Sequence, residues 1–340
     1  MVSAVQAARQ GLRRHPVLIS APLAVLALTA GFAARALLST PQRASSESRL
    51  LEALIAQPKA SPASAVARQA PPDEAGLSSA ADLQAHRAGS TARGSSMSVP
   101  ERGPQVALEI RVALMQISPR PRLGASGPWR LRDRSGQVIR QGQSGETFDV
   151  GGLMASRSEL WLETTPHHHL SADGRPYAGR FRLLRGADGL QVVNHLPLEG
   201  YISSVVGGEM PSNWNLEALR AQAVAARSYA LAHMARPADD HWHLGDTTRW
   251  QNYTGLASVT DRTLEATQST AGIILSFQGG IVESLYAATQ QISQEAHGHL
   301  GASMSQHGAQ DLASQGFRFN EILGRYYQGA SLARLQTGAG

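Results

Sequence analysis

The sequence predicts an α+β fold, in which a β-rich part at residues 105–196 packs with an α+β part of catalytic-domain type at residues 197–335. Between residues 105 and 196, apolar and polar residues alternate in short runs, as is typical of half-buried strands. A long alanine-rich run follows, with apolar residues at the three- and four-residue spacings of a helix. Two further segments, residues 1–38 and 39–104, precede this globular region.

Residues 1–38 are predicted to form a cytoplasmic tip followed by a membrane anchor or a signal peptide. Arg9, Arg13 and Arg14 precede residues 16–34, which carry no charge. This apolar run is close to the roughly 20 residues that span a bilayer, and the positive flank places the N-terminus in the cytoplasm. Small residues at 30–36 also suit cleavage of a signal peptide, which is the alternative interpretation. Both interpretations predict an extracytoplasmic protein, either anchored to the cell membrane or secreted.

Residues 39–104 are predicted to be a disordered linker. They contain no Phe, Trp or Tyr and are rich in Ala, Ser, Pro, Gln and Arg. Such a composition buries too little apolar surface to offset the entropy lost on ordering the chain.

The β-rich part contains several runs with the two-residue period of a strand. Turn residues such as Gly, Ser and Asp separate them. The expected strands are 106–114 (VALEIRVAL), 129–133 (WRLRD), 137–142 (QVIRQG), 146–150 (ETFDV), 159–164 (ELWLET), 179–184 (GRFRLL) and 190–196 (LQVVNHL).

The α+β part opens with the alanine-rich helix. Its stripe consists of Leu216, Leu219, Ala223, Ala226 and Ala230, whose small side chains imply close approach to a neighbouring backbone. Any of three polar residues can cap its N-terminus, and a proline ends it: Ser212, Asn213, Asn215 and Pro237. The remaining expected elements are a helix at 260–269, a hairpin of 273–277 with 281–286, and a helix at 306–315 before residues 319–327.

Composition excludes several kinds of chemistry. The chain has a formal net charge of +5 and no cysteine, so disulfides, thiolate nucleophiles and cysteine-ligated zinc are impossible. The basic residues form no cluster interleaved with aromatic residues, so we expect no nucleic acid as a partner.

The leading catalytic candidate is Glu209, which follows Gly207 and Gly208 just before the alanine-rich helix. We expect it at a strained strand-to-helix junction that presents the carboxylate into a groove. There, burial beside apolar neighbours would raise its pKa and suit it to act as a general acid. The alternative is a carboxylate that only stabilises a helix N-terminus, which is also the simpler interpretation of Glu217. Glu199 is the other nearby carboxylate.

Several residues around Glu209 are candidates for binding a substrate. Arg220 and Arg227 are seven residues apart, so they share one helix face, where they either bind carboxylates of a ligand or form ion pairs. Planar amides and aromatic rings suit sugar hydroxyls and ring faces, although plain packing is the alternative for the tyrosines. These candidates are Gln222, Tyr229, Gln251 and Tyr253.

Residues 196–230 resemble the signature of the SpoIID/LytB family, which comprises stage II sporulation protein D and the amidase enhancers. The shared motifs are Pro197-Leu198-Glu199, Tyr201, Val205, Glu209-Met210-Pro211 and LRAQAVAARSYA at 219–230. Further motifs are Asp246-Thr247-Thr248, Gln251, Tyr253 and Gly255, then Met304-Ser305-Gln306, Gly308-Ala309 and ILGRYYQGA at 322–330. The resemblance thus covers roughly residues 105–335.

The resemblance implies a peptidoglycan lytic transglycosylase without a cofactor, with Glu209 as the catalytic acid and base. This carboxyl would protonate the oxygen between N-acetylmuramic acid and N-acetylglucosamine. It would then take the proton of the muramic C6 hydroxyl, which closes to a 1,6-anhydro product, so one carboxylate suffices where hydrolases use two. Ser305 and Gln306 join the substrate-binding candidates. The implied partners are glycan strands and a cell-wall amidase.

Some positions depart from the family pattern. Gly245 and Trp250 stand where zinc-binding members have cysteines, so no metal site is expected; His241 and His243 are too few for one. The tract of residues 167–169 is expected to be a surface loop. Residues 286–290 (YAATQ) replace a stretch like YHSSSGG, and Leu300 stands in place of a histidine. These changes favour the alternative function, a non-catalytic peptidoglycan-binding amidase enhancer.

Overall fold

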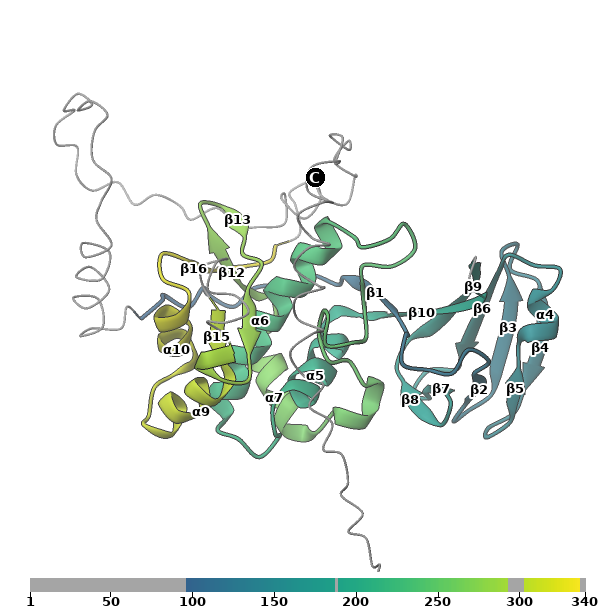
Figure 1. Ribbon diagram of the computed structural model, residues 1–340, viewed down its shortest axis with the longest axis horizontal. Helices are drawn as coiled ribbons and strands as arrows, with labels where there is room; N and C mark the ends of the chain where they lie inside the picture. The colour runs from purple at the N-terminus through teal and green to yellow at the C-terminus, as the bar shows by residue number, and fades with distance from the viewer. Residues whose placement is uncertain (1–95, 187–188, 293–302, 337–340) are drawn as a thin grey trace, which may run out of the picture. The chain divides into compact units, whose positions relative to one another are not determined.

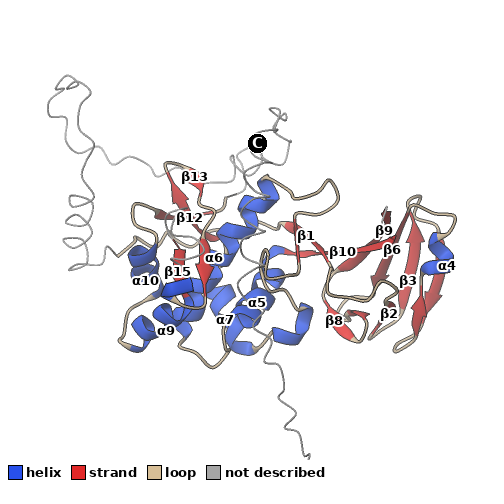
Figure 2. Ribbon diagram, viewed as in Figure 1, coloured by secondary structure: helices blue, strands red, loops and turns tan. Residues whose placement is uncertain are grey.

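The computed structural model describes residues 96–186, 189–292 and 303–336. It has a mixed α+β fold with several sheets, as the sequence predicts (Figures 1 and 2). None of the helices in these ranges is long and apolar enough to cross a membrane. The predicted anchor or signal peptide at residues 16–34 and most of the predicted linker lie outside the described residues.

The β-rich part is organised around a seven-stranded sheet. Its order is β11-β1-β10-β9-β6-β3-β4, and every pair of neighbours is antiparallel except β1 and β11. The strands are β1 (Glu109–Ala113), β3 (Trp129–Asp133), β4 (Val138–Gly142), β6 (Glu159–Thr164), β9 (Arg180–Gly186), β10 (Gly189–Pro197) and β11 (Leu244–Gly245).

A four-stranded antiparallel sheet packs against one face of the larger sheet. It has the order β5-β2-β7-β8 and consists of β2 (Arg122–Ala125), β5 (Thr147–Asp149), β7 (Leu170–Ala172) and β8 (Arg175–Tyr177). Trp129 of β3 stacks on Phe148 of β5 with ring centroids 4.4 Å apart, and Tyr177 of β8 meets Phe181 of β9 at 5.5 Å. Alternate residues of the large sheet thus enter the core, which explains the two-residue period of the sequence. A short helix, α4 (Gly151–Met154), follows β5.

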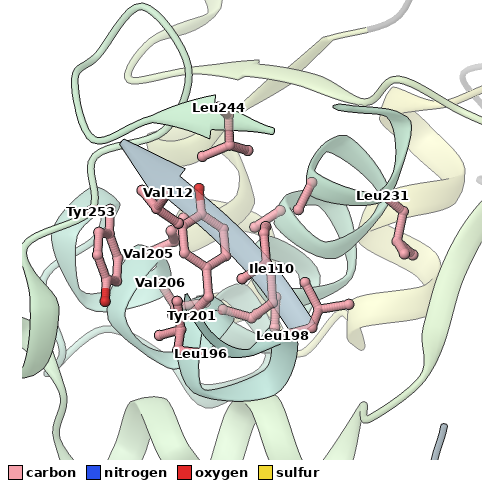
Figure 3. Packing of buried hydrophobic residues seen from close by; sticks show 14 of the residues in the cluster. Ile110, Val112, Leu196, Leu198, Tyr201, Val205, Val206, Leu231, Leu244 and Tyr253 are labelled. Atoms are coloured by element: carbon pink, nitrogen blue, oxygen red, sulfur yellow. The ribbon is translucent and has the colours of Figure 1, made fainter. Parts of the chain in front are cut away.

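The helical part begins directly after β10. It contains α5 (Leu198–Glu209), α6 (Leu216–Ala235), the 3₁₀ turn η1 (Gly255–Ser258) and α7 (Asp261–Ser269). Figure 3 shows Ile110 and Val112 of β1 packed beside Tyr201 and Val205 of α5, so one core joins the sheet to the helices. The alanines of α6 are buried on nearly every side, and the side chain of Asn215 caps the helix by accepting the N–H of Glu217.

The C-terminal elements surround α6. A three-stranded antiparallel sheet has the order β13-β12-β16, and β14 pairs in parallel with β15. The elements are β12 (Ile273–Phe277), β13 (Gly280–Ile281), β14 (Leu285–Ala287), β15 (Ser303–Ser305), α9 (Gln306–Ser314), α10 (Phe319–Tyr326) and β16 (Ser331–Arg334). Both α9 and α10 contact α6.

Each strand expected between residues 106 and 196 is present, and β3 and β6 have the predicted bounds. One expectation in the helical part is wrong. Residues 198–209 are a helix, so Glu209 lies between two helices rather than at a strand-to-helix junction. The predicted hairpin is present, but its second strand ends at Ile281 instead of residue 286, and the Oγ of Ser284 donates to the carbonyl of Ala225.

Residues 96–104 fall within the predicted linker but contact the folded body. Met97 is buried, and its carbonyl accepts a hydrogen bond from the side chain of Asn320 at 2.8 Å. The carbonyl of Glu101 accepts one from Nε of Arg334 at 2.6 Å. The ordered body therefore starts before residue 105.

Candidate functional site

The site is built around Glu209, the last residue of α5. Its Oε1 accepts a hydrogen bond from the backbone N–H of Asn252 at 2.8 Å, and its Oε2 accepts one from Nε2 of Gln306 at 3.3 Å. The loop before η1 and the start of α9 thus meet at the end of α5. Glu209 is half-buried, and its carboxylate is held from two sides.

Burial raises the pKa of Glu209 above the usual value of 4.5. The hydrogen bonds from Asn252 and Gln306 stabilise the charged form and oppose this rise without cancelling it. A larger fraction of the carboxyl is therefore protonated near neutral pH than for an exposed glutamate. This is the condition that a general acid requires.

A group of tyrosines lies near this carboxyl. Burial, and after it the charge of Glu209, raises the pKa of Tyr286 well above its usual value. Tyr201 is fully buried, and its pKa is raised chiefly by that burial. Both phenols therefore stay protonated and can act as hydrogen-bond donors.

Gln251 connects these tyrosines inside the core. Its Oε1 accepts from the hydroxyl of Tyr201 at 2.9 Å, and its Nε2 donates to the hydroxyl of Tyr286 at 2.8 Å and to the carbonyl of Ala226 at 3.1 Å. Gln251 is fully buried. Its amide therefore holds α5, α6 and β14 together, and the structure shows it as a core residue rather than at a sugar-binding surface.

Tyr253 and Gln222 are also enclosed. The hydroxyl of Tyr253 donates to Oδ1 of Asn194 at 2.6 Å, and its ring is 1% exposed. Gln222 is 0% exposed, and neither polar atom of its amide has a hydrogen-bond partner among the described residues. Direct contact of either side chain with a sugar would require the surrounding residues to move.

Arg227 is paired inside the protein. Its guanidinium is fully buried and makes two parallel hydrogen bonds to the carboxylate of Glu199, from Nε at 2.9 Å and from Nη2 at 2.7 Å. It also donates to the carbonyls of Ile273 at 3.0 Å and Thr267 at 3.3 Å. These four hydrogen bonds favour the ion-pair interpretation of Arg227.

Arg220 lies on the same face of α6, as its spacing from Arg227 predicts. Its Nε donates to the Oγ of Ser269 at 2.9 Å, and its Nη atoms contact the carboxylates of Glu217 and Glu265. This face packs against α7. The shared face therefore serves the contact between helices. Glu217 and Glu199 each have an arginine partner, whereas Glu209 has none within residues 96–186, 189–292 and 303–336.

The other two candidates have different surroundings. Tyr229 lies at the edge of the tyrosine group, with its ring centroid 4.5 Å from His233 and 6.5 Å from Tyr286. Ser305 is buried and caps α9 by accepting the N–H of Gly308 at 3.0 Å. Of the described residues that the sequence predicts for this site, Gln306 is the one that is hydrogen-bonded to Glu209.

Asn252 is the contact that sequence reasoning missed. It lies between two predicted site residues, but it acts on Glu209 through its backbone N–H, which every residue except proline has. Neither residue type nor spacing could therefore single it out.

Among the described residues, no three His, Asp or Glu side chains come together as a metal site would require. His243 is buried against Arg111, and burial, followed by the charge of that arginine, lowers its pKa to about 3. His167 and His168 are exposed on a loop, as expected from the sequence.

Comparisons with known proteins show what the segment that carries Glu209 is similar to. Residues 186–277 match the model of the SpoIID family, described as stage II sporulation protein. This match runs from β10 to β12 and includes Glu209 and Asn252, whereas Gln306 lies beyond it.

Three relatives were found. An uncharacterized protein of Brachyspira hyodysenteriae is 32% identical over 117 residues, which cover 34% of this chain and 32% of the relative. The amidase enhancer of Bacillus subtilis is 31% identical over 138 residues, which cover 40% of this chain and 19% of the relative. Stage II sporulation protein D of Bacillus subtilis is 33% identical over 118 residues, which cover 29% of this chain and 33% of the relative.

The matched segments thus span a third or less of each relative. They nevertheless agree with the family model and with the motifs around Glu209. The resemblance of this segment to the SpoIID/LytB family, expected from the sequence, is confirmed.

Proposed function

We propose that this protein is a peptidoglycan lytic transglycosylase and that Glu209 is its catalytic acid and base. The observation that carries the proposal is a half-buried carboxyl of raised pKa that has no arginine or lysine partner among the described residues. The other candidate carboxylates, Glu199 and Glu217, are committed to Arg227 and Arg220. Relatives named amidase enhancer and stage II sporulation protein D support a role in the cell wall.

The chemistry needs one carboxyl that changes its protonation state within the cycle. Protonated Glu209 donates its proton to the glycosidic oxygen as the bond from that oxygen to C1 of N-acetylmuramic acid breaks. The carboxylate then accepts the proton of the C6 hydroxyl while O6 bonds to C1. The sugar supplies the nucleophile itself, so a second carboxylate, which ordinary glycosidases need, is not required.

A second candidate function is a non-catalytic peptidoglycan-binding protein that enhances an amidase. The relative named amidase enhancer and the altered stretch after Tyr286 favour it. Under both functions the partner is the glycan strand, and the site lies on the extracytoplasmic side, either anchored to the membrane by residues 16–34 or secreted after cleavage. Protease treatment of intact cells tests this location: degradation of residues 96–336 without lysis supports it, and full protection contradicts it.

Digestion of purified glycan strands separates the two functions. Wild-type protein, Glu209→Gln and the exposed control Glu265→Gln are each incubated with peptide-free and peptide-bearing strands, and mass spectrometry detects 1,6-anhydromuramic ends. We expect products from the wild type and the control, and a loss of roughly 100-fold or more in Glu209→Gln. Strands retained by all three proteins without any anhydro product would support the binding function instead.

A further inference from the structure

The loop that begins at Asn252 is fastened to the last turn of α5. The side-chain Nδ2 of Asn252 donates to the carbonyl of Gly208 at 2.6 Å, and its backbone N–H donates to Oε1 of Glu209 at 2.8 Å. One residue thus binds both the end of the helix and the carboxylate that the helix carries. A second fastening lies at the other end of the loop, where the Oγ of Ser258 donates to the carbonyl of Ser204 at 2.8 Å.

The glycine pair before Glu209 permits this approach. A Cβ on Gly207 would lie 2.0 Å from the carbonyl oxygen of Ser258, and a Cβ on Gly208 would lie 2.3 Å from that of Asn252. Both distances are far below contact, so any other residue would push the loop away from the helix. The glycines are therefore needed for close packing and not for a strained backbone, since neither has a positive φ.

The two hydrogen-bond partners of the Glu209 carboxyl differ in whether they can only donate or can also accept. A backbone N–H can only donate, so Oε1 must offer it a lone pair in both protonation states of Glu209. A glutamine amide can donate through Nε2 or, turned over, accept through Oε1, so Gln306 can bind Oε2 whether or not that oxygen carries a proton. The shorter bond lies on Oε1 and the longer on Oε2.

We propose that Asn252 is a positioning residue: its side chain locks its own backbone N–H against Oε1 of Glu209, so that the proton for transfer is carried by Oε2. The inference rests on the proposed function for its catalytic consequence. Without the bond to the carbonyl of Gly208, the loop can withdraw, and the proton is then shared between both oxygens of the carboxyl. Asn252 itself does not touch the reacting atoms.

The test compares Asn252→Ala with Ser258→Ala, which removes the other fastening of the same loop and leaves Glu209 alone. The pKa of Glu209 is measured by ¹³C NMR of its labelled carboxyl, with Glu209→Gln to assign the signal. Because the Asn252 N–H bond lowers this pKa, Asn252→Ala should raise it further, whereas Ser258→Ala should not change it. In digestion of glycan strands, kcat should fall about tenfold in Asn252→Ala with KM within twofold, and the acid limb of the pH profile should shift with the pKa.

A purely structural role predicts a different result. If Asn252→Ala lowers the Tm as Ser258→Ala does while the pKa of Glu209 and kcat stay at wild-type values, the proposal is wrong. Should Asn252→Ala not fold, Asn252→Ser, whose hydroxyl is too short to span the same gap, takes its place. A wild-type protein without activity would refute the transglycosylase function, but the NMR comparison would still decide whether Asn252 positions Glu209.

Discussion

Replacing Glu199 by alanine should destabilise the protein strongly, because it leaves the guanidinium of Arg227 buried without a counter-charge. Arg227 is 0% exposed, and Glu199 provides two of its charge-assisted hydrogen bonds, at 2.9 and 2.7 Å. Removing one partner of a buried ion pair typically costs 3–5 kcal/mol. The side chain of Glu199 is itself 33% exposed, so water can replace part of what is lost. We therefore expect a cost near the lower end, about 3 kcal/mol.

Urea denaturation followed by circular dichroism measures this cost as a shift of the midpoint at unchanged slope. For a folded body of this size, about 3 kcal/mol also corresponds to a fall of roughly 6–12 °C in Tm. Glu265→Ala is the matched control, because its carboxylate lies 3.7 Å from Arg220 at a largely exposed position. Its expected cost is at most about 1 kcal/mol.

The comparison also decides what Arg227 does. If Glu199→Ala is as stable as Glu265→Ala, Glu199 does not hold the buried guanidinium, and the reasoning from the pair fails. A loss of affinity for glycan strands at unchanged stability would then return Arg227 to the substrate-binding candidates. A large loss of stability with wild-type affinity supports the structural role.

Three further predictions follow from the same contacts. Gly208→Ala should lower the free energy of unfolding by about 1–3 kcal/mol, because the new Cβ overpacks against the neighbouring loop. Gly200→Ala in the same helix should raise it by up to about 1 kcal/mol, because a Cβ there meets nothing within 4 Å. Equal effects of the two variants in thermal denaturation would contradict the close approach of the loop to Gly208. Tyr253→Phe should lower the free energy of unfolding by about 1–2 kcal/mol, because it removes the buried hydrogen bond to Asn194, and it should leave the yield of anhydro products unchanged. A wild-type Tm with a reduced yield would instead indicate that Tyr253 contacts the sugar. Glu209→Gln should be more stable than the wild type at pH 7 but not at pH 4.

Much of the β-rich part could be predicted from the sequence. One face of its long strands is buried, so apolar and polar residues alternate along them. The strands β3 and β6 show this most clearly. The strands β2, β7 and β8 were missed, since three or four residues are too few for a period to be visible. The helix α5 was missed for another reason: Gly207 and Gly208 are poor helix formers, but the contact with the loop outweighs that propensity.

At the site, residue type and spacing predicted few of the contacts that the three-dimensional structure shows. The spacing of Arg220 and Arg227 correctly placed them on one face, but their partners, such as Glu199 and Glu265, lie far away in the sequence. Gln251 looked suited to sugars because its amide is planar, and the same planarity lets it join three core elements. Pairing and burial arise only when distant segments meet, so spacing within one segment could not reveal them.

The expected stability of Glu209→Gln follows from the direction of the pKa shift. The pKa of Glu209 is raised in the folded protein, chiefly by burial, and returns to about its usual 4.5 on unfolding. Between these two values the folded state binds more protons than the unfolded state, so the contribution of Glu209 to stability falls as the pH rises through this window.

Glutamine cannot ionise, and its Oε1 can still accept the N–H of Asn252. The variant should therefore have a higher urea midpoint than the wild type at pH 7, and the difference should disappear at pH 4. A constant difference across this range, or a less stable variant at pH 7, would mean that the folded protein does not resist the charge on Glu209. Proteins retain a destabilising buried acid at neutral pH when catalysis needs it. The comparison of urea midpoints at pH 7 and pH 4 therefore tests both the effect of Glu209 on stability and its proposed catalytic role.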